Sequence, residues 1–310
     1  MTDTIRIDIS KDHLDAHRLS DENCAQFANT KAGLKTLNKW IGCTSHRVVY
    51  EATGRYHREM EACLSQAGFV LVKVNPRRAR QFANAIGKDA KTDRIDAAML
   101  ARMGSVLELK GQPLKTANMH DLSELHVARR GLIKDQTACR NRLAGVRHKL
   151  VKSQLKARLG HVEKQITQVN AELKRLIHKD ESLKRSFTIL TSIPGIGAVA
   201  ATSVLIEMPE IGTMTSSQVG ALAGLAPVTR ESGNWKGQSH IKGGRAGLRK
   251  ALYMPALVAV RFNRQMCEKY TALRAAGKPA KLALTVIMRK LIILANSLIH
   301  ENREWTEIRP

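Results

Sequence analysis

The hydrophobic pattern of the first hundred residues switches between the period of a strand and the period of a helix. Strand-like runs occupy residues 5–9, 13–19, 25–29, 47–51 and 69–74. Helical spacing occupies residues 31–40, 56–67 and 76–103. Period-two alternation predicts strands, and recurrence every three or four residues predicts helices. Three strands, a helix and then alternating strand and helix predict an α/β domain, which we assign to residues 1–110.

The middle of the chain has a different pattern, which is helical and free of proline from Met119 to Lys184. Apolar residues step by alternating four and three positions, at Leu155, Leu159, Val162, Ile166, Val169, Leu173 and Leu176. The same spacing occurs in a shifted register at Leu143, Val146 and Leu150, which predicts a stutter near Ser153. Such a seam predicts either a long helical hairpin or a dimeric coiled coil. We assign residues 111–185 to this spacer.

Residues 186–310 predict a third, mainly helical domain. Ser192 to Gly197 precede an Ala/Val-rich helix and resemble the turn of a helix-hairpin-helix. In that turn, glycines let backbone N–H groups at a helix start approach a phosphate, so Gly195 and Gly197 are predicted to contact nucleic acid. An apolar helix, a polar Gly-rich loop, a basic helix and a final apolar helix follow at 219–225, 229–244, from 245 and at 280–299.

The charge balance indicates which class of molecule the protein binds. There are 51 Lys and Arg against 27 Asp and Glu, a net charge of +24. Such an excess indicates a polyanion, and nucleic acid is favoured over membrane because no stretch approaches the roughly 20 apolar residues of a bilayer span. The N-terminus lacks a signal-peptide pattern, and the five cysteines form no C-x-x-C pair. We therefore expect reduced thiols in a cytoplasmic protein.

Four carboxylates stand where acids are unusual or paired. Asp8 lies mid-strand, Glu51 ends the strand 47–51, and Asp93 and Asp96 share one helix face. Taken singly, an edge-strand charge, a loop ion pair and a helix cap explain them better than catalysis does. Together they match the places where a ribonuclease-H-like domain converges its acids. Such an oxygen-rich set suits Mg²⁺, with Mn²⁺ as the alternative, in phosphodiester displacement.

Three further acids flank this set, at Asp12, Asp15 and Asp89. Asp12 lies beyond the end of the first strand and is left out of the metal-binding set.

Two basic groups are candidates for contact with nucleic acid. One follows the strand 69–74, at Arg77, Arg78 and Arg80. The other surrounds the Gly-rich loop, at Arg230, Lys236, Lys242, Arg245 and Arg249. The phosphate backbone is the target we expect for both.

Ser232, beside Gly233, is the candidate nucleophile of that loop. A serine needs a base or a metal to activate it, and no His–Asp partner is evident nearby. The ordinary alternative, a polar surface loop, is favoured by the residues alone. If Ser232 does chemistry, the two end domains must meet in space.

Five short motifs follow one another along nearly the whole chain. They are Ile7-Asp8-Ile9-Ser10-Lys11, Glu51-Ala52-Thr53-Gly54, Lys91-Thr92-Asp93-Arg94-Ile95-Asp96, Ile193-Pro194-Gly195-Ile196-Gly197, and Ser232-Gly233 through Leu248-Arg249. In this order they resemble the DEDD transposases of insertion elements whose recombinase is guided by a bridge RNA. The resemblance implies a RuvC-like N-terminal domain, a coiled-coil middle and a C-terminal transposase domain.

The resemblance also implies roles for single residues. Asp8, Glu51, Asp93 and Asp96 would bind metal, and Ser232 would become covalently joined to DNA, with Ser239 as its neighbouring alternative. Family members act as oligomers in which one subunit's acidic domain meets another's serine domain, so the resemblance implies a dimer or a tetramer here. It also implies that a structured non-coding RNA selects donor and target DNA. With 4% aromatic residues, backbone contact fits the composition better than base stacking.

Two other functions remain open at this point. A RuvC-like nuclease or resolvase would use water and be indifferent to Ser232→Ala. A non-catalytic nucleic-acid-binding protein would need an incomplete set of carboxylates, whereas all four are present here.

Overall fold

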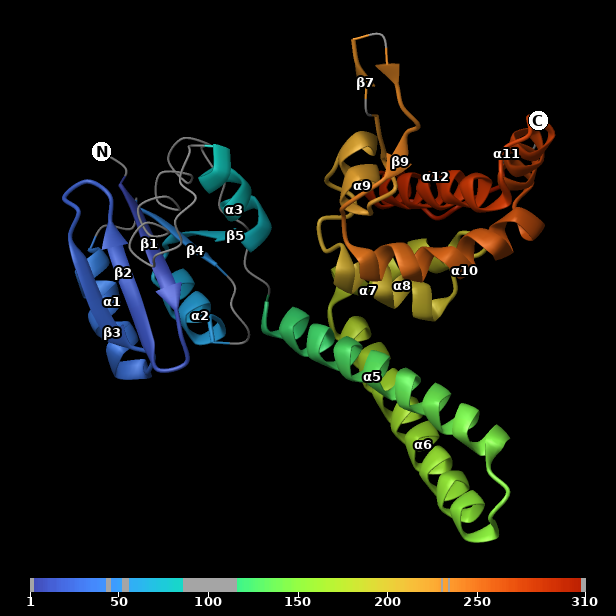
Figure 1. The fold of residues 1–310 in the computed structure, drawn as a ribbon, viewed down its shortest axis with the longest axis horizontal. Coiled ribbons are helices and arrows are strands. Elements are labelled where there is room, and N and C mark those ends of the chain that lie inside the picture. Colours follow the sequence, from blue (N-terminus) through green and yellow to red (C-terminus); the bar gives the residue numbers. More distant parts are fainter. Residues whose placement is uncertain are drawn as a thin grey trace. The chain divides into compact units, whose positions relative to one another are not determined.

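The structure is a computed structural model that describes residues 3–42, 46–51, 56–85, 116–229, 231–233 and 235–307. The chain divides into two compact units, Met1–Lys115 and Thr116–Pro310. We refer to them as unit 1 and unit 2 and describe each by itself (Figure 1).

Unit 1 is built on a mixed five-stranded sheet. Its strands are β1 (Thr4–Ile9), β2 (His13–Arg18), β3 (Cys24–Ala28), β4 (Arg47–Glu51) and β5 (Val70–Val74). The order is β3-β2-β1-β4-β5; β1, β2 and β3 are antiparallel neighbours, and β4 runs parallel to both β1 and β5. The five predicted strands are confirmed to within a few residues. This sheet is compatible with a ribonuclease-H-like domain.

Three described helices cover the two faces of this sheet: α1 (Lys31–Ile41), α2 (Arg58–Gln66) and α3 (Pro76–Ala85). On one face the alternate residues Ile5 and Ile7 of β1 join the core formed with α1 and α2. On the other face Val49 and Val72 form a smaller core with Ala79 of α3. The period-two pattern of β4 and β5 thus places side chains in both cores, as expected for strands covered on both sides.

Unit 2 begins with a long helical hairpin of α5 (Ala117–Gly145) and α6 (Lys149–Lys179). The two helices lie side by side (Figure 1). Hydrogen bonds from Arg129 Nε to Asn170 Oδ1 (2.6 Å) and from Gln136 Nε2 to Glu163 Oε1 (3.2 Å) show their antiparallel register. Of the two predicted alternatives, the helical hairpin is therefore present within one chain. Coiled-coil pairing between chains stays a prediction.

Six more described helices form a bundle at the root of this hairpin: α7 (Glu181–Ser192), α8 (Ala198–Glu207), α9 (Ser216–Leu222), α10 (Ala246–Phe262), α11 (Arg264–Ala275) and α12 (Ala280–His300). α12 matches a membrane-crossing helix in length and apolar composition, but half of its most apolar stretch is buried. Its Ile287 and Leu291 belong to the core that α7, α8 and α10 share. We therefore interpret α12 as the central core helix of unit 2.

The predicted loop at 229–244 is a two-part β-ribbon in the structure. β6 (Pro227–Val228) pairs with β9 (His240–Ile241), and β7 (Glu231–Ser232) pairs with β8 (Trp235–Lys236). We refer to residues 227–241 as the ribbon, which projects from the bundle (Figure 1). Gly233 makes the sharp turn possible with a φ of 56°, a value that glycine adopts without strain. The sequence did not reveal these strands, because each is only two residues long and most of the segment is polar.

Candidate active site

Two of the predicted carboxylates end neighbouring parallel strands. β1 and β4 pair with Ile7 opposite Tyr50, so the next residues, Asp8 and Glu51, follow in the same register. Ile7 and Tyr50 both point into the core under α1 and α2. Because side chains alternate along a strand, Asp8 and Glu51 share the opposite face. They thus meet at the carboxyl ends of β1 and β4, where active sites of open α/β sheets lie.

A third carboxylate lies on the other side of Asp8. The β1–β2 register places Asp15 directly opposite Asp8, and the Asp15 carboxylate accepts a hydrogen bond of 2.8 Å from Gln26. Three acids, Asp15, Asp8 and Glu51, therefore cross the sheet in a row, which we call the acid row. The antiparallel register, which the sequence does not state, is what makes Asp15 a neighbour of Asp8.

A buried cation lies next to the acid row. Arg6 is two residues before Asp8 on the same face, its side chain is 8% exposed, and its Nη2 lies 3.8 Å from Asp8 Oδ2. Asp8 itself is 40% exposed, and its Oδ1 also accepts the N–H of Ile9. Burying a guanidinium is costly unless an anion compensates it. We interpret Arg6 as the positive charge that offsets repulsion between the acids.

A polar network on the opposite face fixes the end of β4. The Tyr50 hydroxyl donates to the Glu61 carboxylate of α2, which also receives Lys73 Nζ of β5 at 3.1 Å. Lys73 Nζ lies 2.7 Å from His57 Nε2 at the start of α2. Burial and the Glu61 charge raise the pKa of Tyr50, so its hydroxyl stays a donor. This network joins β4, β5 and α2 directly behind Glu51.

The remaining residues predicted in the N-terminal part are only partly described. Asp93 and Asp96 lie outside the described residues, as do the side chains of Arg77 and Arg78, while Arg80 is exposed on α3. Among described residues, no group of three or more His, Cys, Asp or Glu forms a metal cluster. The outer acids of the row are two strands apart, about 10 Å, too far to share an ion. Asp8 and Glu51 offer adjacent carboxylate oxygens, the ligand type that Mg²⁺ prefers.

In unit 2, Ser232 lies at the tip of the ribbon, exposed and paired with Trp235 across the turn. No hydrogen bond to its side chain occurs within the part of the chain that the structure describes. Ser239, the alternative, is exposed just before β9. Lys242 is exposed just after it, whereas Arg230 and the side chain of Lys236 lie outside the described residues. A serine nucleophile needs a base or a metal to activate it, and the role of Ser232 as a nucleophile stays a prediction.

Two arginines hold the base of the ribbon: Arg245, just before α10, and Arg249, in its first turn. Arg245 donates to both carboxylate oxygens of Glu210 at 2.7 Å and to the carbonyl of Glu207 at 2.6 Å. Arg249 donates to the carbonyls of Gly243 and Gly224 at 2.9 and 3.3 Å. Bidentate Arg–carboxylate pairs fix orientation. In the structure these guanidinium groups therefore anchor the ribbon; their predicted contact with nucleic acid stays a prediction.

The Gly195–Gly197 turn joins α7 to α8, and the two glycines differ. Gly195 has a φ of 103°, and a Cβ there would lie 2.6 Å from the carbonyl oxygen of Pro255 in α10. Gly197 precedes α8 without a side-chain cap, and a Cβ there would meet nothing within 4 Å. Gly195 therefore allows close packing of α10 on the turn, while Gly197 leaves the start of α8 open.

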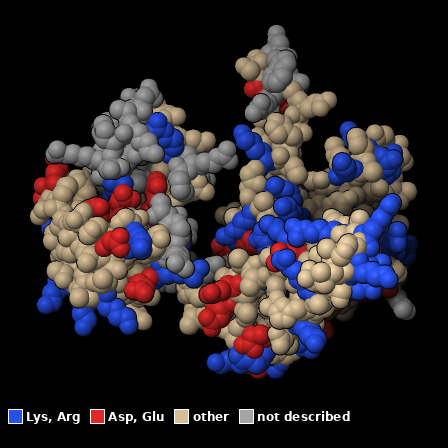
Figure 2. Space-filling model, turned by 60° about the horizontal axis from the view of Figure 1, so that its bottom comes forward, with Lys and Arg blue, Asp and Glu red and all other residues tan. Residues whose placement is uncertain are grey.

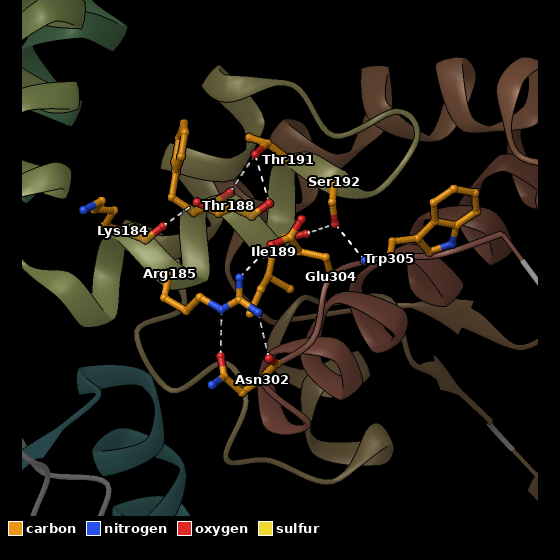
Figure 3. A network of polar contacts seen from close by, with 10 residues as sticks. Lys184, Arg185, Thr188, Ile189, Thr191, Ser192, Asn302, Glu304 and Trp305 are labelled. Atoms are coloured by element: carbon orange, nitrogen blue, oxygen red, sulfur yellow. Dashed lines mark hydrogen bonds and ion pairs between the residues drawn. The ribbon is translucent and has the colours of Figure 1, made fainter.

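The C-terminal segment braces α7 beside this turn (Figure 3). Arg185 donates to Asn302 Oδ1 at 3.0 Å and to Glu304 Oε1 at 2.6 Å. The N–H of Trp305 donates to Ser192 Oγ at 2.8 Å, at the last residue of α7. These contacts join residues more than a hundred positions apart in the sequence, so they tie the segment after α12 to α7.

Known proteins resemble both units of the chain. A family model of the DEDD transposases of IS110 elements matches residues 5–149, and that of the Transposase IS116/IS110/IS902 family matches residues 187–271. The pilin gene-inverting protein of Moraxella bovis is 31% identical over 321 residues, which cover 97% of each chain. The chain belongs to the IS110 family of transposases. The pilin gene-inverting protein of Moraxella lacunata is also 31% identical over 321 residues. The transposase for insertion sequence element IS1111A of Coxiella burnetii is 26% identical over 243 residues, which cover 68% of this chain and 62% of that one.

Membership in the IS110 family confirms the predicted enzyme class, a DNA transposase or recombinase. The first matched segment contains Asp8, Glu51, Asp93 and Asp96, and the second contains Ser232. Sequence reasoning missed the buried Arg6 and the ribbon anchor at Arg245 and Glu210. A cation amid the β-branched residues of β1 was the available signal for Arg6, whereas nothing local signalled the anchor.

Proposed function

We propose that this IS110-family transposase breaks and rejoins DNA through a phosphoserine intermediate formed by Ser232, with metal bound at the acid row. The observation that carries the proposal is the register that brings Asp8 and Glu51 together at the carboxyl ends of two parallel strands. The exposed Ser232 at the tip of an anchored ribbon supplies the second element.

The carboxylates would hold the metal. Asp8 and Glu51, joined by Asp93 and Asp96, present oxygen ligands of the kind Mg²⁺ or Mn²⁺ accepts. When bound, the ion supplies positive charge to the phosphate under attack. Without the ion, Arg6 offsets the negative charge of Asp8, and the Tyr50–Glu61–Lys73 network keeps the end of β4 in place. Orientation of ligands by buried neighbours is a common requirement of metal sites.

The serine step exchanges one ester for another. The Ser232 oxygen forms a bond to phosphorus while the bond from phosphorus to a deoxyribose oxygen breaks. The proton lost by the serine hydroxyl is balanced by the proton that the leaving oxygen gains. A hydroxyl of a second DNA strand then displaces the serine, so the phosphodiester is restored without an energy source. Arg245 and Arg249 contribute by holding the ribbon that presents Ser232.

The relatives support rejoining over plain hydrolysis. The Moraxella bovis relative is named for inverting a pilin gene, and inversion requires both cut ends to be resealed in a new orientation. A covalent ester retains the phosphodiester energy that hydrolysis would lose. We extend this chemistry to the present chain as part of the proposal.

Guide RNA and oligomerisation complete the proposed function. If a bridge RNA pairs with donor and target DNA, the protein need only hold backbones, which suits a net charge of +24 with 4% aromatic residues. We propose that dimers or tetramers act in the cytoplasm, with the acid row of one subunit serving Ser232 of another. The ribbon's projection from its own bundle supports such sharing.

The first experiment looks for the adduct. Wild type, Asp8→Asn, Ser232→Ala and Ser239→Ala are incubated with junction DNA and flanking non-coding RNA, with Mg²⁺ or EDTA. A protein–DNA adduct on a denaturing gel is expected for wild type and Ser239→Ala with Mg²⁺ only. Cleavage without adduct that survives Ser232→Ala would identify a water-using nuclease instead.

Mixing tests the sharing of sites. Asp8→Asn and Ser232→Ala are each expected to be inactive alone. A mixed oligomer regains one complete site only if the carboxylates and the serine come from different subunits. Recovered adduct formation in the mixture supports the shared site, whereas an inactive mixture of proven hetero-oligomers would place both groups in one chain.

A further inference from the structure

The far end of the α5–α6 hairpin differs in charge from the rest of the chain. Residues 136–162 contain seven Lys and Arg and no Asp or Glu. Acids return on both sides, at Asp135 and Glu163. The hairpin end lies at the bottom of Figure 1 and faces the reader in Figure 2, where Lys and Arg cover much of unit 2. An acid-free cationic surface repels itself unless an anion binds there.

Most cations of this end are also unpaired. Among the seven, and within the described residues, only Arg140 reaches an acid, with its Nη2 2.9 Å from Glu163 Oε1. The other six are exposed and form no ion pair among the described residues, namely Arg142, Arg147, Lys149, Lys152, Lys156 and Arg158. Nearer the root, acids are present and two arginines pair with them: Arg175 with Glu172, and Arg130 with Glu207. The end of the hairpin therefore differs from the root in having no acid of its own to pair with its cations.

The spacing on α6 gives this surface a direction. Lys149, Lys152 and Lys156 are three and four residues apart, so they line one side of the helix over about 10 Å. That length covers roughly three phosphates of one DNA strand at 3.4 Å each. Residues 136–162 contain no Phe, Tyr or Trp on which the bases of a single strand could stack.

We propose that the end of the α5–α6 hairpin, residues 140–158, is a docking surface for the sugar-phosphate backbone of duplex DNA. DNA is the polyanion that membership in the IS110 family supplies. The hairpin is then a DNA-holding arm and not only a spacer. The proposal rests on the DNA substrate alone and does not depend on serine chemistry.

The test compares two triple variants of one helix in the full-length chain. K149Q/K152Q/K156Q removes three charges at the end of α6, and K164Q/K174Q/K179Q removes three exposed lysines nearer its root. Binding to a labelled duplex of the element's end is measured by fluorescence anisotropy across a salt titration. EDTA and Ser232→Ala in both backgrounds prevent cleavage, so binding is read even if the proposed catalysis is wrong.

The end variant is expected to bind about tenfold more weakly, and its slope of log affinity against log salt should fall by roughly 2–3. The root variant should keep the wild-type slope. Equal effects of both triples, or an unchanged slope for the end variant, would overturn the proposal. So would an effect confined to an RNA duplex of equal length. K149R/K152R/K156R retains the charge and should bind like wild type, which separates charge from folding.

Discussion

The acid row of unit 1 and the ribbon of unit 2 place their chemical groups in opposite ways. Asp8 and Glu51 sit at the ends of central strands, with the Arg6 guanidinium buried beside one and a hydrogen-bonded network behind the other. Ser232 sits on a two-residue strand at an exposed tip and is held only at the ribbon's base. The proposed metal ligands would tolerate little displacement, whereas the proposed nucleophile would have to reach DNA and would gain from projection.

The comparison also shows how charge is used. In unit 1 one cation touches the acid row and another lies on the opposite face: Arg6 is buried beside Asp8, and the half-buried Lys73 pairs with Glu61 of α2. In unit 2 arginines form the structural contacts, and Glu210 is the partner that orients Arg245. The net charge of +24 is therefore not all available to a partner, because some of the arginines form ion pairs within the protein.

The largest effect is expected at the acid row, where the two neighbours of Asp8 form a matched pair. Glu51→Gln should reduce cleavage by roughly 10³-fold, because it removes a proposed metal ligand. Asp15→Asn should cost roughly tenfold or less, since Asp15 would act on Asp8 only indirectly. Adduct formation with saturating Mg²⁺ measures both. Equal losses would show that Asp15 is itself a ligand.

The two glycines of the α7–α8 turn provide the next contrast. Gly195→Ala should destabilise unit 2 by about 1–3 kcal/mol, because its Cβ would press on the Pro255 carbonyl at a positive φ. Gly197→Ala should cost less than about 1 kcal/mol, because the space around it is open. Urea unfolding measures both changes. A Gly197→Ala variant that is equally unstable would contradict the described packing.

A smaller effect is expected for the buried cation. Arg6→Met should lower the Mg²⁺ concentration for half-saturation by roughly three- to tenfold, since a competing positive charge is removed from Asp8. The same variant should be less stable in EDTA. Both are read from thermal unfolding across a Mg²⁺ titration, with Lys35→Met on the exposed side of α1 as the control. A weaker affinity for Mg²⁺ would instead mean that Arg6 positions Asp8 for the ion.

The smallest effect concerns pH. His126 of α5 is buried with Nε2 3.4 Å from Glu207, and burial lowers its pKa below the usual 6.5 despite that carboxylate. The unfolded chain therefore binds the proton more readily than the folded one. Stability from this group is present above pH 6.5 and is lost as the pH falls from there through the folded pKa. His126→Gln should flatten this part of a denaturation series measured against pH.

Much of unit 1 was predictable because its strands are long enough to show their period. Ile5, Ile7 and Ile9 mark the buried face of β1, and Asp8 stands out among them. The ribbon escaped prediction because two-residue strands carry no period and polar residues fill it. The anchor escaped because Glu210 and Arg245 are 35 residues apart and nothing between them signals their contact.

The sequence by itself determined the α/β-then-helical order, the polyanionic partner, the four acidic candidates and the family resemblance, because each is written in local period, composition or motif. Only the tertiary structure decided that Asp15 faces Asp8, that Arg6 is buried beside it and that Arg245 binds Glu210. It also decided that α5 and α6 lie side by side as a hairpin within one chain. These are choices of register and pairing, and they depend on distant residues competing for the same surface, which no local pattern encodes.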